Sequence, residues 1–108
     1  MKNILILVGI LLASLLAPKA EAAVLRSKLS SPNVWVFKDS DALSHFERIA
    51  QGGAPDETAV APLLACKTPQ GSKITVFSRG DLTAFVRVIE GSAKGCEGTV
   101  PLGFVQDK

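Results

Sequence analysis

An almost uninterrupted apolar run near the N-terminus, residues 4–16, limits how much of this 108-residue chain can enter a folded domain. Lys2 precedes the run, and residues 20–22 (AEA) offer the small-x-small pattern that a signal peptidase recognises. The run is shorter than the roughly 20 apolar residues that a membrane-spanning helix needs. We therefore expect residues 1–22 to be a signal peptide that is cleaved before Ala23.

The length and charge of the remaining chain exclude several classes of protein. The length fits one small domain, so a two-domain enzyme is excluded. The full chain has a formal net charge of +2, and cleavage would remove two lysines and one glutamate, which lowers the charge to +1. So small a positive charge gives little attraction to nucleic acid. We expect a periplasmic or secreted protein with no nucleic-acid partner and no stable membrane insertion after signal cleavage.

The chain contains two cysteines, Cys66 and Cys96. An exported chain meets an oxidising compartment, and an even number of cysteines favours their pairing. In the chain-entropy model, closing a loop of about 30 residues stabilises a fold by roughly 3.6 kcal/mol. A redox or catalytic thiol is the alternative, but the chain has no C-x-x-C motif and only one histidine. We predict a structural disulfide between Cys66 and Cys96.

Residues 33–108 carry the pattern of one small domain, which follows a short polar lead-in at residues 23–32. Residues 33–37 (NVWVF) are β-branched or aromatic apart from the first, and they predict the first strand. Trp35 lies in this strand between two valines. Because tryptophan is largely buried on average, we expect Trp35 to pack against the helix that follows.

That helix is predicted over residues 40–51. Leu43, Phe46 and Ile49 recur at a three-residue spacing, which places them on one apolar face. The polar cluster at residues 39–41 (DSD) can accept backbone N–H groups at the helix start, and two glycines allow the helix to end. We expect the apolar face to pack on the rest of the domain.

The C-terminal half has the pattern of short strands joined by tight turns. Strands are expected at residues 63–67, 73–78, 82–90 and 99–101, and residues 102–105 close the chain. In the segment 82–90 every second residue is aliphatic, namely Leu82, Ala84, Val86 and Val88. We expect this aliphatic face to line the core. Short strands with tight turns favour a small barrel over an α/β sheet.

Three segments of this half resemble a known family. They are residues 71–76 (GSKITV), 85–88 (FVRV) and 98–105 (GTVPLGFV). Together they are similar to the SH3-like barrel family in its small bacterial exported form, over residues 60–106. The resemblance implies a mainly β fold, a small and strongly bent five-stranded barrel, here with one N-terminal α-helix inserted after the first strand. It also implies a binding module without chemistry of its own.

The family's peptide groove is built from aromatic residues and a proline, and the resemblance carries three residues over to it. Phe85 matches the strand-opening tryptophan, and Pro101 and Phe104 match the closing P-x-x-Y pattern. The chain departs from the family at two points, because Thr99 stands where many bacterial relatives carry tryptophan and the chain has no tyrosine. Packing inside the barrel is the alternative role for all three residues, and the inserted helix can cover the groove.

Two other candidate sites fail on their spacing. His45 has neither a second histidine nor a neighbouring cysteine, so three or four metal ligands are not available, and we expect an exposed helix residue. Residues 91–95 (GSAKG) lack the G-x-x-x-x-G-K-[ST] order of a phosphate-binding loop and predict a turn. We therefore expect no metal and no cofactor.

The sequence predicts a non-enzymatic exported binding or accessory module that recognises a peptide in the cell envelope. The peptide would be a protein segment or the peptide part of peptidoglycan. The alternative is a small secreted inhibitor of an envelope or cell-wall enzyme, which would insert the loop of residues 91–98 held by Cys96. An enzyme is the weakest hypothesis, because the residues for acid–base or metal chemistry are lacking.

Overall fold

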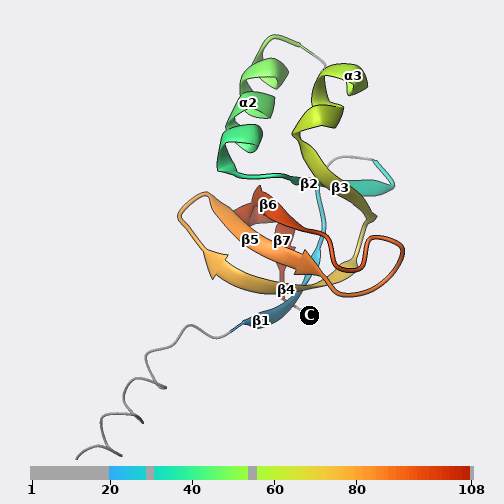
Figure 1. Cartoon of the computed structure of the whole chain (residues 1–108). Helices are drawn as coiled ribbons and strands as arrows, with labels where there is room; N and C mark the ends of the chain where they lie inside the picture. Colours follow the sequence, from blue (N-terminus) through green and yellow to red (C-terminus); the bar gives the residue numbers. More distant parts are fainter. Residues whose placement is uncertain (1–19, 29–30, 54–55, 108) are drawn as a thin grey trace, which may run out of the picture.

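The computed structural model describes residues 20–28, 31–53 and 56–107, which form a mainly β unit with two short α-helices (Figure 1). Most of the predicted signal peptide, residues 1–19, lies outside the described residues. The elements in chain order are β1 (Glu21–Leu25), β2 (Asn33–Phe37), α2 (Ser40–Gln51), α3 (Glu57–Val60), the 3-10 helix η1 (Ala61–Leu63), β3 (Leu64–Pro69), β4 (Ser72–Arg79), β5 (Thr83–Val88), β6 (Glu97–Pro101), the 3-10 helix η2 (Leu102–Phe104) and β7 (Val105–Gln106).

The strands form one antiparallel sheet of seven strands in the order β3-β2-β6-β5-β4-β1-β7. This confirms the mainly β class. The sheet is open, with β3 and β7 at its edges, and it has seven strands where a five-stranded barrel is predicted. The helices α2 and α3 stand together at one end of the strands in Figure 1, and α2 contacts β2, β6 and η1.

The strand β1 corrects the prediction for the N-terminal segment. Residues 23–32 are predicted as a polar lead-in, yet Ala23 and Leu25 are fully buried in β1, which pairs with β4 and β7. The strand predicted as the first, β2, is therefore the second, and the helix follows the second strand. The alternation within β1 spans too few residues to stand out beside the cleavage pattern that overlaps it.

The core lies between the inner faces of the strands. Ala84, Val86 and Val88 on β5 are buried as predicted, together with the inner residues of β4 and β6. Leu82 is 82% exposed, which corrects its placement on the same face. The reason is local, since β5 begins at Thr83 and Leu82 belongs to the preceding turn, where the period-2 alternation of a strand does not hold.

The helix α2 has the predicted bounds. The Asp39 side chain caps its start by accepting a hydrogen bond from the Ala42 N–H at 2.7 Å. Of the predicted apolar face, Leu43 is buried and packs against Phe37 of β2, whereas Phe46 is half-buried. The apolar face of α2 thus packs on β2 through Leu43 and through one side of the half-buried Phe46 ring.

One covalent bond and one close steric contact fix β6 relative to β3 and β2. The predicted disulfide between Cys66 of β3 and Cys96, directly before β6, is confirmed. Gly98 lies where β6 pairs with β2, and a Cβ at this position would meet the carbonyl oxygen of Phe37 and lie 2.7 Å from Val36 Cγ1. Only glycine, with no Cβ, permits so close an approach of the two strands.

Candidate functional pocket

An apolar pocket lies where α2 meets the end of β6. It has a volume of about 90 Å³, and its walls come from β2, α2, β6, η2 and the segment between β1 and β2. The lining residues are Ser27, Ser31, Asn33, Trp35, Phe37, Leu43, Phe46, Glu47, Pro101 and Phe104. A mostly apolar lining with a few polar groups is typical of ligand sites, although this pocket is smaller than the roughly 300–1,000 Å³ of a site for a whole small molecule.

Three aromatic rings form the wall between β2 and α2. The Phe46 ring packs edge-on to Trp35, with 5.6 Å between ring centroids, and lies 5.1 Å from the Phe37 ring at a tilt of 41°. Both are favourable aromatic geometries. Because the rings are held by one another, this wall is in place before any ligand enters.

The pocket combines a buried floor with an accessible rim. Phe37 and Leu43 are each 2% exposed and belong to the core, whereas Trp35, Phe46 and Phe104 are half-buried. The prediction that Trp35 packs against the helix is confirmed by its contact with Phe46. The half-buried rings have free surface that a ligand can cover.

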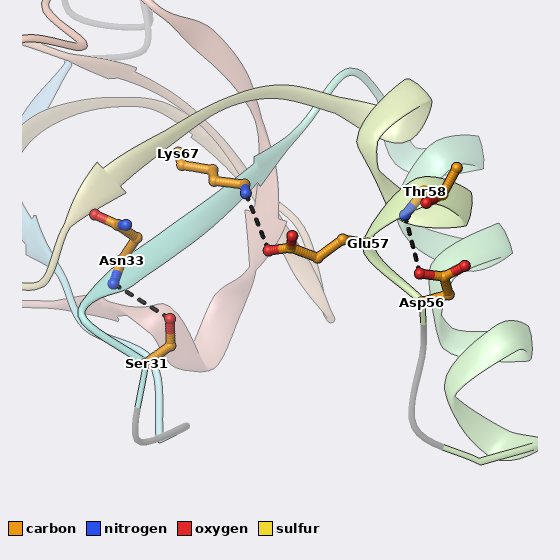
Figure 2. A network of polar contacts seen from close by, with 6 residues as sticks. All are labelled: Ser31, Asn33, Asp56, Glu57, Thr58 and Lys67. Atoms are coloured by element: carbon orange, nitrogen blue, oxygen red, sulfur yellow. Dashed lines mark hydrogen bonds and ion pairs between the residues drawn. The ribbon is translucent and has the colours of Figure 1, made fainter.

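The serine-rich rim is held by the side chain of Gln70, in the turn between β3 and β4. The Gln70 amide accepts a hydrogen bond from the Ser27 N–H at 2.9 Å and donates to Ser27 Oγ at 2.7 Å and to the Ser31 carbonyl at 3.1 Å. The Asn33 N–H donates to Ser31 Oγ at 3.3 Å (Figure 2). These bonds place the neutral polar groups of the rim.

The Trp35 ring also borders a second, smaller hollow on the side of α3. There Lys67 Nζ lies 6.0 Å from the centroid of the Trp35 ring and pairs with Glu57 Oε1 at 3.5 Å (Figure 2). The carboxylate of Asp56 accepts a hydrogen bond from the Thr58 N–H at 3.3 Å and caps α3 (Figure 2). The hollow on this side is bordered by an ion pair, so the two sides of Trp35 differ in chemistry.

The three predicted groove residues do not meet at one place. Pro101 and Phe104 both line the apolar pocket, and both also line an adjoining hollow with Lys28. Phe85 lies elsewhere, 36% exposed on β5, with its ring 5.9 Å from Phe77. Phe85 points to the outer side of the sheet because its neighbours in the alternation, Ala84 and Val86, point inward.

Besides Pro101 and Phe104, the pocket is lined by aromatic residues for which the sequence predicts only a packing role. Trp35 and Phe46 are predicted as contacts between the first strand and the helix, and they do make that contact. Their second role depends on how near α2 lies to Pro101 and Phe104, which no spacing along the chain reveals. In the sequence, the only indication of this aromatic wall is an apolar helix face that directly follows an aromatic strand.

The loop of residues 91–98 is held in its conformation by backbone hydrogen bonds and by the disulfide. The Gly95 N–H donates to the Val88 carbonyl at 2.8 Å, and the Lys94 N–H donates to the Gly91 carbonyl at 3.2 Å. Gly91 and Gly95 adopt positive φ, the region that glycine enters most readily. Cys96 then fastens the loop to β3 through the disulfide.

The described residues contain no group of three or more His, Cys, Asp or Glu side chains that could hold a metal ion. His45 is exposed on α2, as predicted. Within the same residues, no buried side-chain nitrogen or oxygen lacks a hydrogen-bond partner. No helix in the described part of the chain is long and apolar enough to cross a membrane.

Comparison of the chain with protein-family models, with curated proteins and with solved structures finds no match in any of the three. The pocket is therefore interpreted from its own geometry.

Proposed function

We propose that this protein is a non-enzymatic SH3-like binding module that takes an apolar part of an extended peptide into the pocket at Trp35, Phe46, Pro101 and Phe104. The observation that carries the proposal is the meeting of Pro101 and Phe104 with the aromatic wall of α2 and β2 in one pocket. Flat, half-buried rings offer a large contact area at a small cost in side-chain entropy, which suits recognition of an extended chain.

The arrangement of the C-terminal strands supports the SH3-like part of the proposal. The segments that resemble the family fall on β4, on β5, and on β6 with η2 and β7, and β4, β5 and β6 are neighbours in the sheet. In this reading β2, α2 and β3 are additions that supply the second wall of the pocket. The inserted helix then borders the family's groove instead of covering it.

The disulfide supports a place in the periplasm or outside the cell. Disulfide bonds persist in oxidising compartments and are rare in the cytoplasm. A module that works there would meet segments of envelope proteins and the peptides of the cell wall. We propose a peptide from one of these sources as the partner.

A display selection on the immobilised protein tests the proposal. Random peptides are selected for binding, and each selected peptide is then titrated while the fluorescence of Trp35, the single tryptophan of the chain, is recorded. We expect the peptides to change Trp35 emission, because Trp35 lines the pocket. Phe104→Ala should weaken binding by about 2 kcal/mol if Phe104 is a hot spot.

Phe85→Ala is the matched control, since it removes the same kind of ring outside the pocket. Both variants are checked for folding by circular dichroism. Peptides whose binding is reduced by Phe85→Ala and unchanged by Phe104→Ala would contradict the proposal and move the site to the outer face of β5.

The hydrogen-bonded loop of residues 91–98 favours a second candidate function, the secreted inhibitor. A loop that is already fixed by internal hydrogen bonds and a disulfide loses little entropy when it inserts into an enzyme. Lys94→Glu reverses the charge at its exposed tip. If Lys94→Glu abolishes binding of a captured envelope enzyme while Phe104→Ala does not, the inhibitor function is favoured over the pocket.

A further inference from the structure

Among the described residues that line the pocket, only Glu47 carries a charge. We infer that the pocket selects peptide segments in which an apolar side chain is followed closely by a positively charged group, and that Glu47 binds this cation. The inference rests on the proposed function of the pocket. The partner is thus a peptide with a basic residue next to its apolar anchor.

The position of Glu47 carries this inference. Glu47 follows Phe46 on α2, and both line the pocket, so the helix supplies an aromatic ring and, beside it, an exposed acidic residue. Among the described lining residues, Glu47 alone is charged, and the other polar ones are two serines and an asparagine. The ion pairs within the described ranges involve other carboxylates, so no cation of this part of the chain neutralises Glu47.

Lys28 gives the proposed ligand a direction. It lines the adjoining hollow, which shares Pro101 and Phe104 with the pocket. A peptide that crosses these two residues would therefore meet a negative charge at the α2 end and a positive charge at the other end. Complementary charges of this kind orient a ligand and reject the opposite sign more than they add affinity.

The expected size of the effect follows from exposure. Glu47 is exposed, and ion pairs between exposed groups are weak because water and salt screen them. We expect a cationic ligand to bind about two- to five-fold more tightly than a neutral one at low salt. An anionic ligand should bind more weakly than the neutral one, and high salt should remove most of the difference.

Three small probes with the same phenyl group separate the charge from the apolar contact. They are 2-phenylethylammonium, 2-phenylethanol and 3-phenylpropionate, which are cationic, neutral and anionic at neutral pH. Each is titrated into the full-length folded protein labelled with nitrogen-15, and the indole N–H signal of Trp35 is followed by NMR. The chain has one tryptophan, so this signal is assigned without ambiguity and lies at the pocket.

We expect all three probes to shift the Trp35 signal, with the cation binding most tightly and the anion least. Glu47→Gln should abolish the preference for the cation over the neutral probe, since it keeps the size of the side chain and removes its charge. Glu90→Gln is the control, because it removes an equal charge at the far end of β5 and keeps the acceptor for the Lys73 N–H. The control should preserve the order of affinities.

The outcomes separate this inference from the proposed function. If no probe shifts the Trp35 signal, the pocket itself is not a binding site and both proposals fail. If all three probes bind the unaltered protein equally well, the pocket stands and the role of Glu47 is overturned. A cation preference that survives Glu47→Gln also overturns that role.

Discussion

The ring of Phe46 stands edge-on to the indole of Trp35, with 80° between the ring planes and 5.6 Å between their centroids. This contact joins α2 to β2, and it forms the wall of the pocket at the same time. Stability and recognition therefore depend on the same pair of side chains.

Phe46→Ala should lower the free energy of unfolding by about 2 kcal/mol. The loss is smaller than the 3–5 kcal/mol typical of a fully buried phenylalanine, because Phe46 is half-buried. The Trp35 emission of the folded variant should shift to longer wavelength, since water reaches more of the indole. Urea unfolding measures the first quantity and fluorescence the second. His45→Ala, an exposed neighbour on the same helix, should leave both unchanged.

Removal of the disulfide should destabilise the fold and leave pocket binding intact. Cys66→Ala with Cys96→Ala should lower the free energy of unfolding by roughly 3 to 4 kcal/mol. The reason is that the open chain has more conformations to lose on folding. Chemical denaturation of the oxidised protein and the double variant gives the difference. Two free thiols found by alkylation and mass spectrometry in the native exported protein would contradict the structural role of the bond.

Gly98→Ala should be among the more damaging single substitutions in the sheet. The new Cβ would meet the backbone carbonyl of Phe37, which cannot move without shifting β2. Overpacking of this kind costs about 1 to 3 kcal/mol. Gly103→Ala is the matched control, because a Cβ there meets nothing within 4 Å and the backbone needs no positive φ. Thermal unfolding should separate the two variants clearly, and equal melting temperatures would show that β6 and β2 can move apart.

The mature N-terminus remains a prediction, and the structure shows what cleavage before Ala23 would remove. Arg79 Nη2 lies 2.9 Å from Glu21 Oε2, and both Glu21 and Ala22 pair with β4. Intact mass of the exported protein should give a chain that starts at Ala23. That chain would lack the exposed Glu21–Arg79 ion pair, which is worth no more than about 1 kcal/mol. A mass that retains residues 1–22 would refute the cleavage prediction.

Local patterns predicted the local elements of this fold. The helix over residues 40–51 and the strand over 33–37 have their predicted bounds because spacing and residue type determine them. The pairing of Cys66 with Cys96 follows from the count alone, since two cysteines allow one intramolecular bridge. In the segment 82–90, the alternation predicts the inner face correctly from Ala84 onward.

The remaining features depend on contacts between distant residues. Burial of Ala23 and Leu25 arises from pairing with β4, about 50 residues later, and their small apolar pattern alone does not reveal it. The pocket likewise depends on where α2 sits against Pro101. The resemblance in sequence assigned Phe85 and Phe104 to one surface, whereas the pleat of β5 turns Phe85 to the outer side of the sheet, away from the pocket.

The open sheet leaves two edge strands, and their residues determine whether the protein self-associates. An exposed edge strand offers unpaired backbone groups on which another chain can add a strand, the first step of aggregation. At one edge β7 has only two residues, and at the other β3 carries Lys67 and ends at Pro69, which has no N–H to donate. A short edge, a charge and a proline are the devices by which sheets resist growth. Substituting Pro69 and Lys67 would remove two of these devices from the β3 edge.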